Sequence, residues 1–167
     1  MQATTAIQSG ILLAVALVLI LAAIEDVRTR RISNRLSIII LALFTANAMT
    51  GIVSGQDILA VAIWPLVVGI SVFAVGLALF AAGLMGGGDV KLLAAVALFA
   101  GPKLGLSLVL YVTALGGLVA LALLLWNRVR SNTGLNAGPN ANKVPYGVAI
   151  AGGGLWVCFT QISVLSN

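Results

Sequence analysis

The chain has 167 residues, of which 61% are hydrophobic and only 8% are charged. Soluble domains carry about 25% charged residues, so this composition excludes a water-soluble fold and indicates a protein that folds in lipid. The net charge of +5 then reflects the Lys and Arg that membrane proteins concentrate in cytoplasmic loops, rather than binding to nucleic acid.

Long apolar runs dominate the sequence and show no strand-like alternation. Only helices and closed barrels satisfy their backbone hydrogen bonds in lipid, so these runs predict helices. A crossing takes roughly 20 apolar residues, so we predict an all-α membrane protein, one domain over residues 1–167 that forms a polytopic bundle of about six transmembrane helices. The predicted crossings are residues 6–24, 36–50, 58–82, 90–100, 106–126 and 144–165. No Lys or Arg precedes the first, so we interpret it as a retained helix rather than a secretory signal.

The fourth predicted crossing is short and meets Gly101-Pro102. Residues 90–100 rise only about 16 Å at helical pitch, which is less than a bilayer core of about 30 Å. The helix must therefore borrow residues at its ends or lie beside a thinned or hydrated region. Either arrangement places Asp89 near the membrane surface.

The basic residues fit six crossings better than five. With six crossings, only Lys103 of the nine basic residues lies outside. The eight on the cytoplasmic side are Arg28, Arg30, Arg31, Arg35, Lys91, Arg128, Arg130 and Lys143. Fusing the fourth and fifth crossings would move the last three of these outside, against the positive-inside bias.

The chain holds no histidine and one cysteine. Zinc needs several His, Cys or carboxylate ligands, so we predict no metal and no cofactor. The acidic residues are Glu25, Asp26, Asp57 and Asp89. Asp57 falls on the outer side, where a helix cap before Ile58 explains it.

Asp26 and Asp89 both fall at the cytoplasmic ends of apolar helices, where ionisable groups are candidates for function. Two carboxyl groups held close cannot both ionise cheaply, so one can act as a base and the other as an acid on a water molecule. Spacing alone favours a structural explanation, in which Asp26 pairs with Arg30 and Asp89 caps the fourth helix. Three consecutive glycines before Asp89 shift the balance, because they allow another chain segment to approach closely. A phosphate cradle is disfavoured, because no P-loop lysine follows and Asp89 would repel an anion.

Three motifs carry a family resemblance, in order along the chain. Gly86-Gly87-Gly88-Asp89 resembles the Gly-x-Gly-Asp signature of membrane aspartic proteases, and the following Val-Lys-Leu resembles its prepilin peptidase form. The segment from Asp26 to Asn34 resembles the first catalytic motif of the prepilin leader peptidases, although Ser33 stands where the family often has Pro. Residues 143–149 resemble the Pro-Tyr-Gly motif that opens the last helix of that family.

The resemblance implies that Asp26 and Asp89 are the catalytic pair of an aspartic endopeptidase. It implies removal of a basic leader from Flp/Tad or type IV pilin precursors, at the cytoplasmic face of the bacterial inner membrane or an archaeal equivalent. The chain lacks the cytoplasmic insert of the longer members and looks like the short branch, so we expect no methyltransferase activity. The expected partners are such a prepilin-like substrate and the bilayer; the sequence leaves the oligomeric state open.

The other candidate site residues each have two interpretations. Lys91 either shapes the site or reaches the membrane interface. Tyr146 either hydrogen-bonds near the aspartates or anchors its helix at the interface. Asn34 either holds the loop after Asp26 or binds the substrate backbone, or it caps the second helix. The residues that we expect to shape the site or bind substrate are Gly86, Gly87, Gly88, Lys91, Asn34, Pro145, Tyr146 and Gly147.

Two other functions remain open at the level of sequence. Acids in membrane helices also serve as proton relays, so a small proton-coupled transporter is one alternative. A non-catalytic subunit of a pilus or secretion assembly, in which the aspartates only pair with arginine, is the other.

Overall fold

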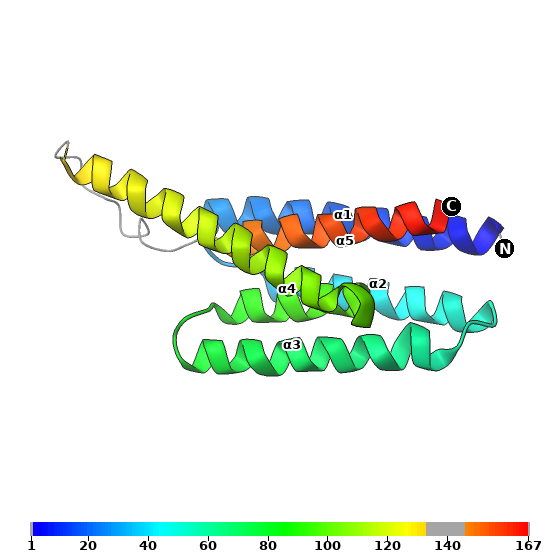
Figure 1. The fold of residues 1–167 in the computed structure, drawn as a ribbon. Coiled ribbons are helices and arrows are strands. Elements are labelled where there is room, and N and C mark those ends of the chain that lie inside the picture. The colour runs from blue at the N-terminus through cyan, green and yellow to red at the C-terminus, as the bar shows by residue number, and fades with distance from the viewer. Residues whose placement is uncertain (1, 133–145, 167) are drawn as a thin grey trace.

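The computed structural model describes residues 2–132 and 146–166, and all of the regular structure there is helical. Five helices are long and apolar enough to cross a membrane, which confirms the predicted all-α polytopic bundle. The elements are α1 (Gln2–Thr29), α2 (Asn34–Val53), a π-helical turn η1 (Leu59–Ile63), α3 (Trp64–Ala81), α4 (Gly87–Asn132) and α5 (Tyr146–Ser166) (Figure 1).

The helix α4 consists of two limbs that meet at a sharp break. Gly101 has φ 55° and ψ −166°, which is not helical, and Pro102 follows it. Glycine adopts positive φ without a steric penalty, and proline cannot donate to the helical ladder, so the predicted boundary at this pair is confirmed. The short limb (residues 87–100) and the long limb (residues 102–132) run in opposite directions (Figure 1). The five helices therefore make six passages of the bundle.

The first helix extends further than its apolar run. It continues past the predicted crossing and ends at Thr29. The next residue, Arg30, has φ 54°, which is not helical. Residues 25–29 contain neither glycine nor proline, so nothing interrupts the helix there. As a result, Asp26 lies inside α1 rather than after its end.

The six passages have two distinct ends. The N- and C-termini and the connection from α2 to η1 lie at one end, which we call the terminal end, and the break at Gly101 points toward this end but stops short of it (Figure 1). The connections from α1 to α2 and from α3 to α4 lie at the other, which we call the loop end. Asp26 and Asp89 both belong to the loop end, as parity along the chain predicts.

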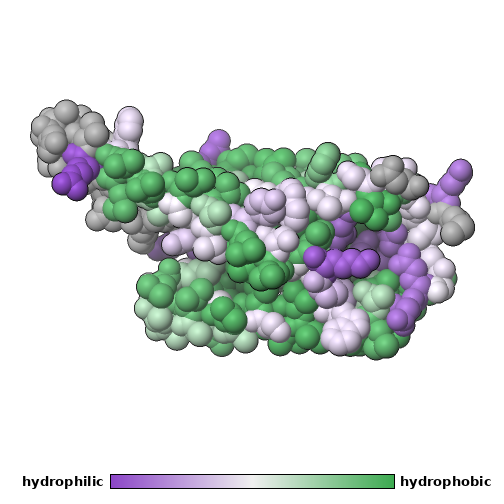
Figure 2. All heavy atoms as spheres, in the orientation of Figure 1, coloured by the Kyte–Doolittle hydropathy of each residue, from purple (hydrophilic) through white to green (hydrophobic). Residues whose placement is uncertain are grey.

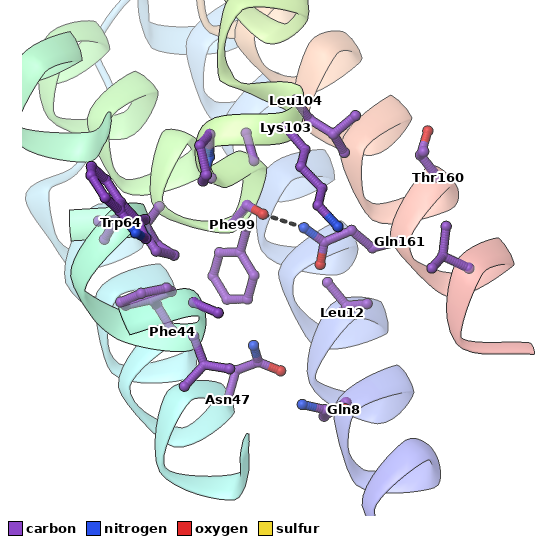
Figure 3. A pocket seen from close by; sticks show the side chains of 18 of the residues that line it. Gln8, Leu12, Phe44, Asn47, Trp64, Phe99, Lys103, Leu104, Thr160 and Gln161 are labelled. Atoms are coloured by element: carbon purple, nitrogen blue, oxygen red, sulfur yellow. Dashed lines mark hydrogen bonds between the residues drawn. The ribbon is translucent and has the colours of Figure 1, made fainter. Parts of the chain in front are cut away.

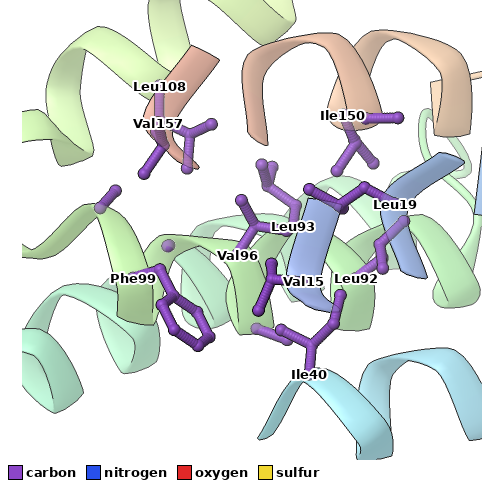
Figure 4. Packing of buried hydrophobic residues seen from close by; sticks show 14 of the residues in the cluster. Val15, Leu19, Ile40, Leu92, Leu93, Val96, Phe99, Leu108, Ile150 and Val157 are labelled. Atoms are coloured by element: carbon purple, nitrogen blue, oxygen red, sulfur yellow. The ribbon is translucent and has the colours of Figure 1, made fainter. Parts of the chain in front are cut away.

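The core forms around the short limb of α4. This limb packs against α2 and α3. α5 packs against both α4 and α1. Small residues bring the helices close, because a side chain on Gly76 would meet Val90 at 2.8 Å. Figure 4 shows the largest side chains of the buried cluster converging from four helices. They include Val15, Leu19, Ile40, Leu92, Val96, Leu108, Ile150 and Val157.

The outer surface is apolar over most of the face seen in Figure 2, where hydrophilic residues gather toward the terminal end. Many large apolar side chains are exposed, including Leu110, Leu118 and Leu124 on the long limb. A soluble monomer rarely exposes so continuous an apolar surface, whereas lipid covers it without cost. The exterior thus agrees with a membrane protein.

Candidate active site

Asp26 is held at the amino end of α5. Its side chain is only 5% exposed. The backbone N–H of Gly147 donates a hydrogen bond of 2.8 Å to Asp26 Oδ2, and the N–H of Val148 also interacts with this carboxyl group. The first N–H groups of a helix have no partner within the helix, so they are free to stabilise a negative charge. The guanidinium of Arg30 adds a favourable charge nearby.

Gly147 is required by this close approach. A side-chain carbon at this position would lie 2.8 Å from Asp26 Cβ, from Asp26 Oδ2 and from Ile32 Cδ1. Real Cβ atoms do not approach other atoms so closely, so any other residue would push α5 away from Asp26. The glycine of the Pro-Tyr-Gly segment thus lies directly against the first of the two aspartates.

Asp89 lies in the first turn of the short limb and is half-buried. Its carboxyl group lies beside Gly86, the residue before the helix. Because the helix begins at Gly87, Asp89 is its third residue and does not occupy the N-cap position predicted for the structural alternative. Ile32, whose side chain lies against Gly147 beside Asp26, also lies against Gly88, the residue before Asp89.

The three glycines before Asp89 allow two close approaches. A side-chain carbon on Gly88 would lie 2.9 Å from the carbonyl oxygen of Ile32, in the connection between α1 and α2. One on Gly86 would lie 2.6 Å from Asp89 Oδ2. Gly87 has more room, since its nearest neighbour is the Phe80 ring at 3.4 Å. Gly88 therefore lets the chain after Asp26 pack directly on the start of the helix that carries Asp89.

Lys91 and Asn34 form a bond beside this contact. Lys91 Nζ donates to Asn34 Oδ1 at 3.0 Å. Of the interpretations left open for Asn34, the helix cap is wrong, because Ser33 is the N-cap and its hydroxyl accepts from Arg35 N at 3.3 Å. Ser33, which departs from the family pattern, thus has a structural role of its own, and Asn34 is free to join α2 to the short limb.

The remaining predicted residues lie at the edge of the site or elsewhere. The ring of Tyr146 packs against Gly116 of the long limb, where an added side-chain carbon would lie 3.2 Å from the ring. Pro145 lies outside the described residues. Asp57 is at the terminal end, where its Oδ1 accepts from Leu59 N at 3.2 Å, so the predicted capping role is confirmed.

An apolar groove of about 480 Å³ starts beside Lys91 and Asn34. α2 and α3, both fully described, do not pack against each other, and each rests separately on the short limb. Ala94, Ala95 and Leu98 form the floor of the gap between them. Near its polar end, the hydroxyl of Ser37 is buried without a hydrogen-bond partner.

Among the described residues, His, Cys, Asp and Glu nowhere gather in a group of three that could hold a metal ion.

Residues 13–121 match the family described as the type IV leader peptidase family. The chain belongs to the type IV leader peptidase family. The match spans both aspartates, the three glycines and Lys91 of this peptidase, and ends before Tyr146 and Gly147. No curated protein and no solved structure matches the chain.

Ile32 and Gly116 are contacts of this peptidase that sequence reasoning missed. Ile32 lies within the segment from Asp26 to Asn34, so its position was visible, but the contact of its backbone with Gly88 was not. Nothing in the sequence distinguishes Gly116, the partner of Tyr146, from the other glycines of the long limb.

Proposed function

We propose that the protein is an aspartic endopeptidase that removes the short basic leader from prepilin-like precursors of the Flp/Tad or type IV pilin class. The observation that carries this proposal is that Ile32 lies against both Gly147, which binds Asp26, and Gly88, the residue before Asp89, in a member of the leader peptidase family. Asp26 is fixed by Gly147, and Asp89 is brought close by the contact of Gly88 with Ile32.

The two carboxyl groups have different roles in hydrolysis. Asp26 accepts backbone hydrogen bonds from α5 and lies near Arg30. Both stabilise its carboxylate more than that of Asp89, so Asp26 acts as the base. Asp89 acts as the acid, because two carboxyl groups held close cannot both ionise cheaply. Asp26 removes a proton from water, whose oxygen attacks the scissile carbonyl carbon. Asp89 then protonates the amide nitrogen as the carbon–nitrogen bond breaks, without a covalent enzyme intermediate.

The groove between α2 and α3 suits the hydrophobic helix of such a substrate. Its floor is built of small residues, and a helix can approach small residues closely in lipid. Its polar end carries Lys91, two residues beyond Asp89. A substrate helix in the groove would therefore begin at the level of the aspartates, and its leader would extend past the glycine loop toward them.

The basic residues support a cytoplasmic orientation of the site. Arg28, Arg31 and Arg35 are exposed at the loop end, close to Asp26 in the chain. By the positive-inside bias, this end lies on the cytoplasmic side of the bacterial inner membrane.

The proposal is tested with the purified full-length protein in lipid and a prepilin-like substrate that has a basic leader and a hydrophobic helix. We expect mass spectrometry to show one cut, at the junction of leader and helix, and we expect a metal chelator to leave the rate unchanged. Failure to cleave, or cleavage that a chelator abolishes and a divalent cation restores, would contradict the proposal.

A further inference from the structure

A second cavity, of about 490 Å³, opens at the terminal end of the bundle, away from the aspartates. Ligand sites in proteins commonly enclose about 300–1,000 Å³, so this cavity is large enough for a small molecule or part of a larger one. Its lining comes from α1, α2, α3, α5 and both sides of the break at Gly101 (Figure 3). The peptidase activity proposed above makes no use of it.

The polar side chains of this cavity are four amides and one cation. They are Gln8, Asn47, Gln56, Gln161 and Lys103, accompanied by the hydroxyl of Thr160. Figure 3 shows Gln8 and Asn47 pointing toward each other, and Lys103 reaching down toward Gln161. The lining contains no acidic residue.

Two of these groups bind the protein itself: the Thr160 hydroxyl donates to the carbonyl oxygen of Trp156 at 2.9 Å, and Gln161 binds a second carbonyl. Gln161 Nε2 donates to the carbonyl oxygen of Phe99, two residues before the break at Gly101 (Figure 3). Gln8 is only 7% exposed, and its amide makes no hydrogen bond within residues 2–132 and 146–166. The amide lines the cavity, so its donor and acceptor are available to a ligand there.

The charge of the site is positive. Lys103 is the one charged residue in the lining, and over the described residues its ammonium makes no ion pair or hydrogen bond. Asp57 follows Gln56 in the chain, but its carboxylate is engaged in capping Leu59. A cation with several amide donors and no competing acid favours a negatively charged oxygen ligand.

The rest of the wall is apolar. Leu12, Phe44, Leu104 and Leu165 line it, and Trp64 stands at its edge, half exposed toward the bilayer. A free anion would gain nothing from these surfaces, whereas an amphipathic ligand would use both parts of the cavity. A phospholipid has that combination, and in this topology it comes from the outer leaflet.

We propose that this cavity binds an anionic phospholipid, with its phosphate at Lys103, Gln8 and Asn47 and part of one acyl chain along the apolar wall. The site would anchor the terminal end of the bundle, near which the break at Gly101 interrupts α4.

Native mass spectrometry of the full-length protein in detergent tests this proposal with three probes: phosphatidylglycerol, phosphatidylcholine and inorganic phosphate. The variants are Lys103→Met and Gln8→Leu. Arg128→Met is the matched control, because it removes a cation from an exposed position outside the cavity.

We expect phosphatidylglycerol to bind more tightly than either of the other probes. Losing a hydrogen bond to a charged group typically weakens binding about tenfold, which we expect for Lys103→Met. Gln8→Leu should weaken it less, and Arg128→Met should leave it unchanged. Equal binding of phosphatidylcholine or inorganic phosphate, or an equal effect of Lys103→Met and Arg128→Met, would overturn the proposal.

Discussion

The two limbs of α4 differ sharply in their surroundings, although one continuous sequence forms both. Almost every residue of the short limb after Asp89 is buried, with Lys91 as the exception. The long limb is exposed over much of its length and turns large leucines outward. Asp89 lies at the start of the short limb and Asp26 lies on α1 against α5, so the candidate site is beside the buried limb of α4.

The glycines of the two limbs show the same contrast. A side chain on Gly88 would meet backbone, whereas one on Gly117 of the long limb would meet nothing within 4 Å. Packing in the short limb therefore fixes the position of Asp89, and the long limb tolerates change. Three matched pairs of variants test this difference between the limbs.

The largest expected difference is between Gly88→Ala and Gly117→Ala. The new methyl group of Gly88→Ala would force Ile32 and the start of the short limb apart, and so move Asp89 away from Asp26. A misplacement of about 1 Å commonly costs about 100-fold in rate, which we expect for cleavage of a prepilin-like substrate. Gly117→Ala should cleave as the wild type does, and similar rates for the two variants would contradict the account.

A smaller effect should follow from blocking the groove. Ile70 lines the groove and is 65% exposed, and Leu118 of the long limb is 63% exposed but lies outside it. We expect Ile70→Trp to raise KM about tenfold with little change in kcat, because it removes substrate binding common to ground and transition states. Steady-state kinetics check this, and an equal rise in KM for Leu118→Trp would show that the groove has no special part in binding.

The smallest effect concerns stability alone. Val96 is fully buried in the short limb and packs against Gly154, where an added side-chain carbon would lie 3.0 Å from Val96 Cγ1. Val96→Ala should lower the free energy of unfolding by about 1 kcal/mol through lost packing, whereas Leu118→Ala should change it by less than about 0.5 kcal/mol. Unfolding in mixed micelles measures both, and equal losses would mean that the two limbs are packed alike.

The sequence was sufficient to predict the six passages and the end of the bundle at which the two aspartates lie. Apolar runs, the positive-inside bias and the Gly101-Pro102 pair depend on local composition, which is visible without a structure. Asp26 and Asp89 stood out because acids are costly at the ends of apolar helices.

The contacts that assemble the site were not predictable in the same way. The bond from Gly147 to Asp26 joins residues 121 positions apart, and the contact of Gly88 with Ile32 depends on how two connections pack. Local rules also misassigned the cap of α2, since Ser33 and Asn34 are both good capping residues and only the backbone geometry distinguishes them. Long-range packing, rather than propensity, decides such cases.

The central claim is that Asp26 and Asp89 are both needed for cleavage. The most direct test is the single-turnover rate of cleavage by Asp26→Asn, Asp89→Asn and Asp57→Asn in folded, membrane-inserted protein. General acid–base groups contribute about 100-fold to 10,000-fold, so each of the first two variants should lose at least about 100-fold. Asp57→Asn should retain the wild-type rate, because Asp57 caps a helix at the terminal end. Continued cleavage by both Asp26→Asn and Asp89→Asn would contradict the account and leave the two aspartates with a structural role.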